Sequence, residues 1–270
     1  MSWLKDTFKT EHPVIAMLHL SSLPGDPFYG RDNTMKQVVE WAHKDLDALQ
    51  DGGVDGVIFS NEFSLPYQRK VSPVTVAAMA RTIGELISNI SIPFGVDVIS
   101  DATASIEMAA ATGAAFVRGT FTGAYVGDGG IQNTDVAATL RRKRDLGLFD
   151  LKLLYFVNQE SDVYINDRDI QSITRSIIFK CQPDGLCVSG ESAGTAASSE
   201  LIKKVKEAAG ITPVFANTGC NASNIAEKLS ICDGAVVGTY FKLDGDFKNH
   251  VDIVRVKELM QAAKTYCQQK

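Results

Sequence analysis

The chain has 270 residues, of which 45% are hydrophobic and 22% charged, so it can bury a sizeable globular core. Its net charge of -5 leaves no basic face for a nucleic acid backbone, and we expect no nucleic acid partner. The apolar runs are strand-sized, well short of the roughly 20 residues of a membrane helix, and the N-terminus lacks a signal-peptide pattern, so we expect a cytoplasmic protein without a membrane partner.

Short apolar runs alternate with longer segments of helical period along the whole chain, with Gly, Pro, Asn and Asp at the joins. The runs predict eight strands, over residues 14–20, 54–60, 93–99, 115–120, 151–158, 184–190, 213–219 and 233–240. A helix is expected after each strand, near residues 34–51, 73–90, 101–112, 134–146, 168–181, 198–209, 221–230 and 250–268. Four of these helices begin with a capping side chain, at Asp101, Thr134, Ser198 and Asn221.

Eight βα units without a long linker favour one (β/α)8 TIM barrel over residues 1–270. The alternative is an open, doubly wound sheet, but the GxGxxG motif of a Rossmann sheet is absent after the first strand. The five cysteines form no CxxC pair, so we expect reduced thiols rather than disulfides or a zinc site.

Polar residues at the carboxyl ends of the strands are the candidate site, because these ends form the active face of such barrels. They are His19, Asn61, Glu62, Asp97, Arg118, Asn158, Ser189, Glu191, Asn217, Thr218 and Thr239. Turns also favour Asn, Ser and Asp, so a purely structural role stays open for each residue alone. His, Glu, Asp and Arg together at a barrel mouth favour function, because charged groups there cost desolvation unless they are paired or used.

Asp97, in the segment GVDV, is the leading catalytic candidate, with Glu62, His19 and Arg118 beside it. Strand alternation places Asp97 on the same side as Gly95, toward the barrel interior. The same alternation lets only one of Asn61 and Glu62 face the barrel axis, and the sequence does not decide between them. A carboxylate here could exchange protons with Asp97 across the mouth, or could bind a divalent cation with His19.

The last three loops favour phosphate binding, because glycines let backbone N–H groups approach an anion. The segments are SGESAGTAAS (189–198), ANTGCN (216–221) and VGTYFK (237–242). The plausible contacts are Gly194, Gly219, Gly238 and Thr239, unless these glycines serve only tight turns. Lys242 follows the eighth strand, where it could meet solvent or a phosphate, and Schiff-base chemistry is not favoured.

Two further loops could form the walls of the mouth: HLSSLPGDPFYG (19–30) and FVRGTFTGAYVGDGGI (116–131). We expect them to close over a ligand, or to contact a second subunit through Phe28, Tyr29, Phe121 and Tyr125.

The first of these loops, together with DGVIFSNEF, GVDV, DGLCVSGESAGTAAS and VFANTGCNASNI in later units, resembles the BtpA family over nearly the whole chain. Ser21 and Ser22 stand where the family loop often has two prolines, which loosens the turn. The resemblance implies a barrel of the ribulose-phosphate-binding type but no particular reaction.

The sequence therefore favours a metabolic enzyme that acts on a small phosphorylated sugar or related metabolite by acid/base chemistry, as an isomerase, epimerase, aldolase or lyase. The alternatives are a non-catalytic assembly or stability factor, as the family's name suggests, and a metal-dependent phosphohydrolase or nucleosidase. The expected partners are a phosphorylated small molecule and further copies of the chain in a homo-oligomer.

Overall fold

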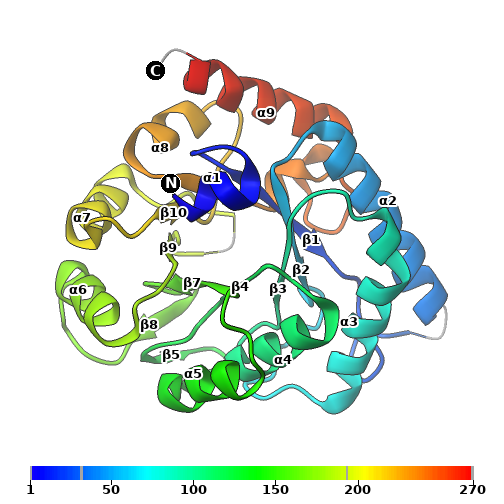
Figure 1. The fold of residues 1–270 in the computed structure, drawn as a ribbon. Coiled ribbons are helices and arrows are strands. Elements are labelled where there is room, and N and C mark those ends of the chain that lie inside the picture. The colour runs from blue at the N-terminus through cyan, green and yellow to red at the C-terminus, as the bar shows by residue number, and fades with distance from the viewer. Residues whose placement is uncertain (1, 31–32, 193, 269–270) are drawn as a thin grey trace.

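A computed structural model describes residues 2–30, 33–192 and 194–268, and its centre is a closed parallel barrel (Figure 1). The strand order around the ring is β1-β11-β10-β9-β7-β4-β3-β2. The barrel strands are β1 (Val14–His19), β2 (Gly56–Ser60), β3 (Phe94–Asp97), β4 (Phe116–Gly119), β7 (Lys152–Phe156), β9 (Gly185–Val188), β10 (Val214–Ala216) and β11 (Gly234–Val237). The predicted barrel is confirmed, and the open sheet is excluded because β1 pairs with both β2 and β11.

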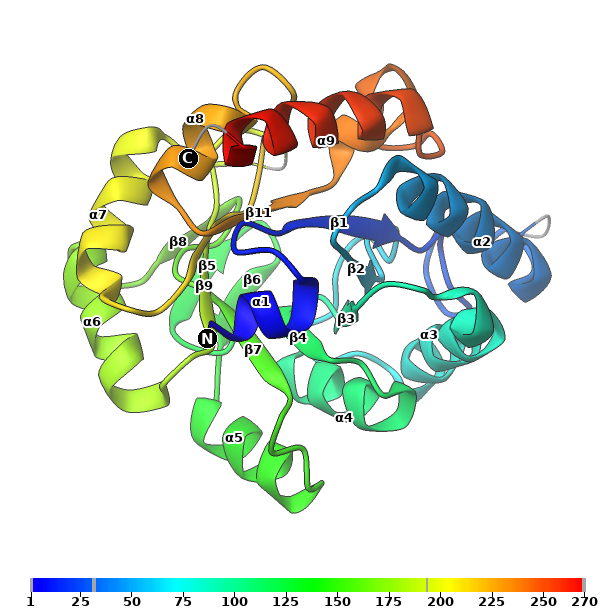
Figure 2. The same ribbon diagram turned by 45° about the horizontal axis from the view of Figure 1, so that its top comes forward.

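Helices follow the barrel strands and cover the outside of the ring (Figures 1 and 2). They are α2 (Met35–Gly52), α3 (Pro73–Leu86), α4 (Ala102–Thr112), α5 (Val136–Asp145), α6 (Ile170–Cys181), α7 (Ser199–Ala209), α8 (Ile225–Ile231) and α9 (Ile253–Gln268). Short 3-10 turns η1 (Ile87–Asn89), η2 (Thr239–Phe241) and η3 (Leu243–Gly245) add to them. Within the described ranges, every helix is too short or too polar to cross a bilayer.

Two of the four predicted helix caps are confirmed. Asp101 and Ser198 accept hydrogen bonds from the first turns of α4 and α7. Thr134 is not the cap of α5, because the carboxylate of Asp135 accepts from Ala138 instead. Asn221 caps a turn before α8 by accepting from Ser223 N and Asn224 N, so that helix begins four residues later than predicted.

Every second side chain of a barrel strand faces the interior, and on most strands these inward residues change from apolar to polar toward the carboxyl end. One buried apolar cluster inside the ring contains Ile15, Met17, Ile58, Phe116, Leu154, Cys187, Phe215 and Val236. The next inward positions, two residues after the last cluster member on each strand, are His19, Ser60, Arg118, Phe156, Ser189, Asn217 and Gly238. Asp97 joins this polar layer two residues after Gly95, where a Cβ would lie 2.4 Å from the Phe116 ring.

A helix that the sequence analysis did not predict, α1 (Trp3–Phe8), closes the amino-terminal end of the barrel (Figure 2). Leu4 and Phe8 join the interior apolar cluster, and the Phe8 ring meets the Phe116 ring edge-on at 5.4 Å. The Trp3 indole N–H donates to Asp184 O at 2.8 Å. With this end closed, ligands have access from the opposite, carboxyl end of the strands.

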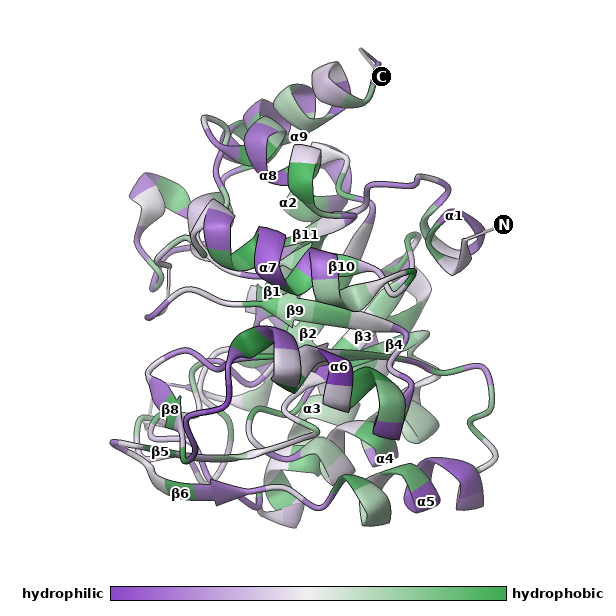
Figure 3. Cartoon of the chain, turned by 90° about the vertical axis from the view of Figure 1, so that its left-hand side faces the viewer, coloured by the Kyte–Doolittle hydropathy of each residue, from purple (hydrophilic) through white to green (hydrophobic). Residues whose placement is uncertain are grey.

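The glycine-rich segment 116–131 is not the simple loop that the sequence suggested. Part of it forms β5 (Ala124–Gly127), which pairs antiparallel with β6 (Gly130–Asn133) and with β8 (Asp162–Tyr164). Figure 3 shows this small sheet and α1 at opposite ends of the barrel. Phe121 and Tyr125 are buried within the chain, so the predicted subunit contacts through these two rings are wrong, whereas Phe28 is exposed.

We expect Phe8→Ala to destabilise the protein by about 3 kcal/mol, because it removes a buried ring that fills the closed end. Urea unfolding followed by circular dichroism measures the change. The matched control is Phe179→Ala, which removes a ring that is 83% exposed and should cost less than about 0.5 kcal/mol. Equal effects of the two substitutions would show that α1 does not close the barrel.

Candidate functional site

A cavity of about 260 Å³ opens at the carboxyl end of the barrel. Its wall contains residues from most of the strand ends and from the loops that follow them. Nine of the predicted site residues line it: His19, Glu62, Arg118, Gly194, Asn217, Thr218, Gly219, Gly238 and Thr239. Further lining residues lie outside the predicted set, among them Glu160, Phe247 and Arg255.

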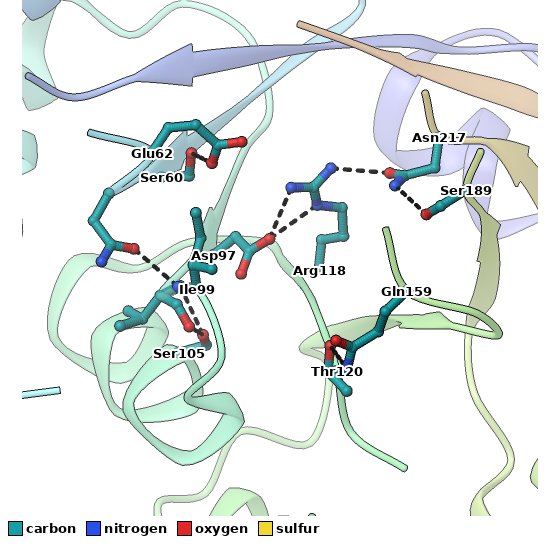
Figure 4. Close-up of polar contacts among 12 residues, drawn as sticks. Ser60, Glu62, Asp97, Ile99, Ser105, Arg118, Thr120, Gln159, Ser189 and Asn217 are labelled. Carbon is teal, nitrogen blue, oxygen red and sulfur yellow. Dashed lines mark hydrogen bonds and ion pairs between the residues drawn. The ribbon is translucent and has the colours of Figure 1, made fainter. Parts of the chain in front are cut away.

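Arg118 is the centre of a hydrogen-bond network across the mouth (Figure 4). Its Nε donates to Asp97 Oδ2 at 3.0 Å, and its Nη2 lies 2.9 Å from the same oxygen. Its Nη1 donates to Asn217 Oδ1 at 2.9 Å, and Asn217 Nδ2 donates to Ser189 Oγ at 2.9 Å. The guanidinium also lies 5.0 Å from the centre of the Phe156 ring. These contacts fix the orientation of Arg118 and leave part of its N–H edge for the cavity.

Asp97, the leading catalytic candidate, lies beneath the cavity lining and not in it, within the described part of the chain. Its side chain is 3% exposed and its carboxylate is paired with Arg118. Burial raises the pKa of Asp97, and the neighbouring guanidinium opposes that rise. The geometry gives Asp97 the position of a residue that orients Arg118, and Glu62 the position beside a ligand.

The choice between Asn61 and Glu62 is settled by strand alternation. β2 ends at Ser60, and Glu62 continues the inward-facing series of Ile58 and Ser60 into the cavity. Asn61 turns away, and its Oδ1 accepts from Ile99 N at 2.8 Å in the loop after β3. Asn61 therefore joins two neighbouring loops and does not line the cavity.

Glu62 has the properties of a group that exchanges protons near neutral pH. Burial raises the pKa of its carboxyl group to about 7; Arg118 opposes this rise, while Asp97 and Glu160 add to it. The Ser60 hydroxyl donates to Glu62 Oε2 at 3.0 Å, and Tyr67 OH donates to Glu62 O at 3.0 Å. The first bond orients the carboxyl group, and the second holds the backbone of the residue that carries it.

Glu160 is the acidic residue that sequence reasoning missed. It lies in the loop after β7, four residues beyond the end of that strand, and it lines the cavity. Burial raises the pKa of Glu160, Arg118 lowers it, and Asp97 raises it further. The segment QES (159–161) contained the signal, since it is a polar run directly after the strand predicted over 151–158.

His19 faces the cavity as a neutral imidazole. Burial lowers its pKa well below the usual value, and the charges of Lys242 and Arg118 add to this effect. Its ring packs 5.2 Å from the Phe247 ring, which in turn stacks on Phe63 at 4.6 Å. Nδ1 of His19 is buried and has no hydrogen-bond partner in the described structure. His19 therefore offers a neutral hydrogen-bonding group beside an aromatic wall.

The loops after β9, β10 and β11 come together on one side of the cavity. Gly219 has φ +64, and a Cβ there would lie 2.1 Å from Ala196 N, so only glycine lets these loops approach so closely. In the described ranges, no acceptor is bonded to the backbone N–H groups of Gly219, Cys220 or Gly238. Arg255 lies beside these loops, with Nε donating to Tyr240 O at 2.6 Å and its guanidinium 4.4 Å from the Tyr240 ring centre.

Three predicted binding residues connect neighbouring loops. Asn158 donates to Ser189 O at 2.8 Å and accepts from Ser189 N at 3.1 Å, which extends the pairing of β7 with β9. The Thr218 hydroxyl, although it lines the cavity, accepts from Gly190 N at 2.6 Å. Glu191 is exposed outside the cavity lining of the described structure, and its carbonyl oxygen accepts from Ser161 N at 3.0 Å.

Lys242 meets neither solvent nor the cavity. Its ammonium group is fully buried and lies 2.7 Å from Asp45 Oδ2 on α2, while His250 Nδ1 lies 2.8 Å from Asp45 Oδ1. This cluster attaches the segment between β11 and α9 to α2. In the described ranges, no group of three or more His, Cys, Asp and Glu side chains has an arrangement that could hold a metal ion.

Solved structures with similar folds have low sequence identity to this chain. A structure described as native KDPGal has a TM-score of 0.60, with 14% identity over 97% of this chain and 99% of that chain. N-(5'-phosphoribosyl)anthranilate isomerase from Pyrococcus furiosus has a TM-score of 0.56, with 16% identity over 94% of this chain and 100% of that chain. At such identities the likeness shows the barrel fold alone.

Sequence relatives cover the chain almost completely. The sgc region protein SgcQ of Escherichia coli (strain K12) is 52% identical over 97% of both chains. The photosystem I biogenesis protein BtpA of Synechocystis is 30% identical over 96% of this chain and 90% of that protein. The BtpA family model matches residues 10–265. The chain therefore belongs to the BtpA family.

Proposed function

We propose that the protein is an enzyme that moves a proton on a small phosphorylated sugar or related metabolite, as an isomerase, an epimerase or an aldolase-type lyase. One observation carries the proposal. Glu62, a carboxyl group with a pKa of about 7, faces the same cavity as the glycine-containing loops after β9, β10 and β11. A general acid or base works best when its pKa lies near the working pH.

In this proposal Glu62 accepts a proton from a carbon next to the ligand's carbonyl group and returns it to a neighbouring atom. Arg118 donates from its free N–H edge to the oxygen that becomes negative. Asp97 and Asn217 hold that guanidinium in place, so it needs no rearrangement during the reaction. His19, which stays neutral, donates or accepts a hydrogen bond at a ligand hydroxyl.

The phosphate would bind on the other side of the cavity. The N–H groups of Gly219, Cys220 and Gly238 are suitable donors, and Arg255 supplies a positive charge beside them. Backbone N–H groups in glycine-containing turns are common phosphate ligands in proteins. The barrel fold supports the location, because (β/α)8 barrels generally have their active sites at the carboxyl ends of the strands.

Phosphorylated ligands should raise the melting temperature of the protein, and their dephosphorylated counterparts should not. The test is a panel of aldose and ketose phosphates, each paired with the free sugar, measured by thermal shift. Arg255→Gln should reduce the phosphate-dependent shift. A panel in which free sugars and their phosphates give the same shift would remove the phosphate from the proposal.

Glu62→Gln should lower proton abstraction by a factor of about 10² to 10⁴, which is the usual contribution of a general base. The readout is exchange of a ligand C–H for deuterium in D2O by NMR, which requires no knowledge of the product. The wild-type rate should rise with pH through about 7, as Glu62 loses its proton. Glu191→Gln, which changes an exposed carboxylate outside the cavity lining, is the matched control. Equal exchange rates in the two variants would eliminate Glu62 as the base.

Glu62 should also make the protein less stable at high pH. Its pKa is raised from 4.5 to about 7 on folding, so the folded state binds the extra proton between these values and stability falls as pH rises through them. Glu62→Gln should therefore stabilise the protein by about 1–3 kcal/mol at pH 8 and change it little at pH 4.5. Urea unfolding at both pH values measures this. A substitution that destabilises more at pH 8 than at pH 4.5 would reverse the sign and contradict the assignment.

A further inference from the structure

The charged groups that line the cavity lie on two separate sides. Glu62 and Glu160 come from the loops after β2 and β7. Arg255 and the glycine-containing turns lie at the loops after β10 and β11. In the ring order, β4 and β3 lie between β7 and β2 on one half, and β11 and β10 belong to the other half. The cavity therefore has an acidic side and a side suited to an anion.

The acidic side has more negative than positive charge. Three carboxyl groups, those of Glu62, Glu160 and Asp97, surround the single guanidinium of Arg118. Each nitrogen of that guanidinium already contacts Asp97 or Asn217, which leaves one further N–H on each of the two terminal nitrogens. Within residues 2–30, 33–192 and 194–268, no lysine or arginine forms an ion pair with Glu62 or Glu160. Two carboxyl groups thus face the cavity without a cation of their own.

Such an arrangement is costly unless a ligand compensates for it. Both side chains are partly buried, and carboxylates that are withdrawn from water without a cation are unfavourable. The negative charge of Glu160 also raises the pKa of Glu62. A hydroxyl group of a sugar can bond to a carboxylate but brings no charge. An ammonium group brings three N–H donors and one positive charge. It would therefore offset the excess of negative charge on this side of the cavity.

We infer that the ligand is a phosphorylated amine, whose ammonium group binds between Glu160 and Glu62 while its phosphate lies at Gly219, Gly238 and Arg255. This inference rests on the proposed function, which supplies the phosphate side, and it narrows the substrate class to compounds with both charges. Glu160 holds the ammonium group. Glu62, which lies beside it, remains the residue that moves a proton.

The test uses simple probes that avoid sugar stereochemistry. Alkyl phosphates of two to five carbons are prepared in matched pairs that carry either a terminal amine or a terminal hydroxyl. Dissociation constants are measured by calorimetry at pH 8 for the wild type, Glu160→Gln, Arg255→Gln and the control Glu191→Gln. Circular dichroism and the melting temperature confirm that each variant is folded.

The best amine should bind at least about tenfold more tightly than its hydroxyl partner, a difference of about 1.4 kcal/mol. Glu160→Gln should remove this preference and leave the binding of the hydroxyl compound unchanged. Arg255→Gln should weaken both compounds, and Glu191→Gln should change neither. The preference should increase from pH 6 to pH 8, because His19 stays neutral and Glu62 loses its proton over that range.

Three results would overturn the inference, and the first two separate it from the proposed function. If amine and hydroxyl compounds bind equally and both need their phosphate, the ammonium site is wrong and the phosphate site stands. If neither series binds and inorganic phosphate produces no thermal shift, the phosphate side fails and the inference fails with it. A preference for the amine that survives Glu160→Gln would also overturn the assignment of Glu160.

Discussion

The buried ion pair between Arg118 and Asp97 determines the arrangement of the barrel mouth. A buried guanidinium is tolerated only if its hydrogen bonds are satisfied, and here the partners come from β3 and from the position just after β10. Asn217 extends the network to Ser189, so strands far apart around the ring are joined through one side chain. Because the donors are held in this way, the positive charge has a fixed position when a ligand enters.

Around this pair, the remaining carboxyl groups take on unusual proton affinities. Glu62 and Glu160 lie within the electrostatic influence of Asp97 and Arg118, and the guanidinium compensates only part of the negative charge. On one side of the site, the Glu62 carboxyl group can gain or lose a proton near neutral pH. The other side is suited to an anion. Both sides lie at the end of the barrel opposite α1, where the interior is no longer filled by apolar side chains.

Much of this arrangement could be predicted from sequence, because period-two alternation carries the interior pattern beyond the end of each strand. The rule placed Asp97 inward. It did not decide between Asn61 and Glu62, because β2 ends at Ser60 and both residues follow it; the structure shows that Glu62 lines the cavity and Asn61 does not. Other features depend on tertiary contacts. Helix α1 is six residues long and is held by the barrel interior, so it has little local signal. The strands β5 and β6 are glycine-rich and short. The residues that pair between β5 and β8 are at least 35 positions apart in the sequence. Glu160 lies in a loop whose path the sequence does not define.

The most direct measurement is the titration of the Glu62 carboxyl group by NMR, with ¹³C-labelled glutamate and assignment by comparison with Glu62→Gln. The central claim is that the mouth contains more buried and partly buried carboxyl groups than Arg118 can compensate. It predicts a Glu62 resonance that titrates with a pKa of about 7. A resonance that titrates near the ordinary glutamate value of about 4.3 would contradict it, because the carboxyl group would then be solvated or fully paired.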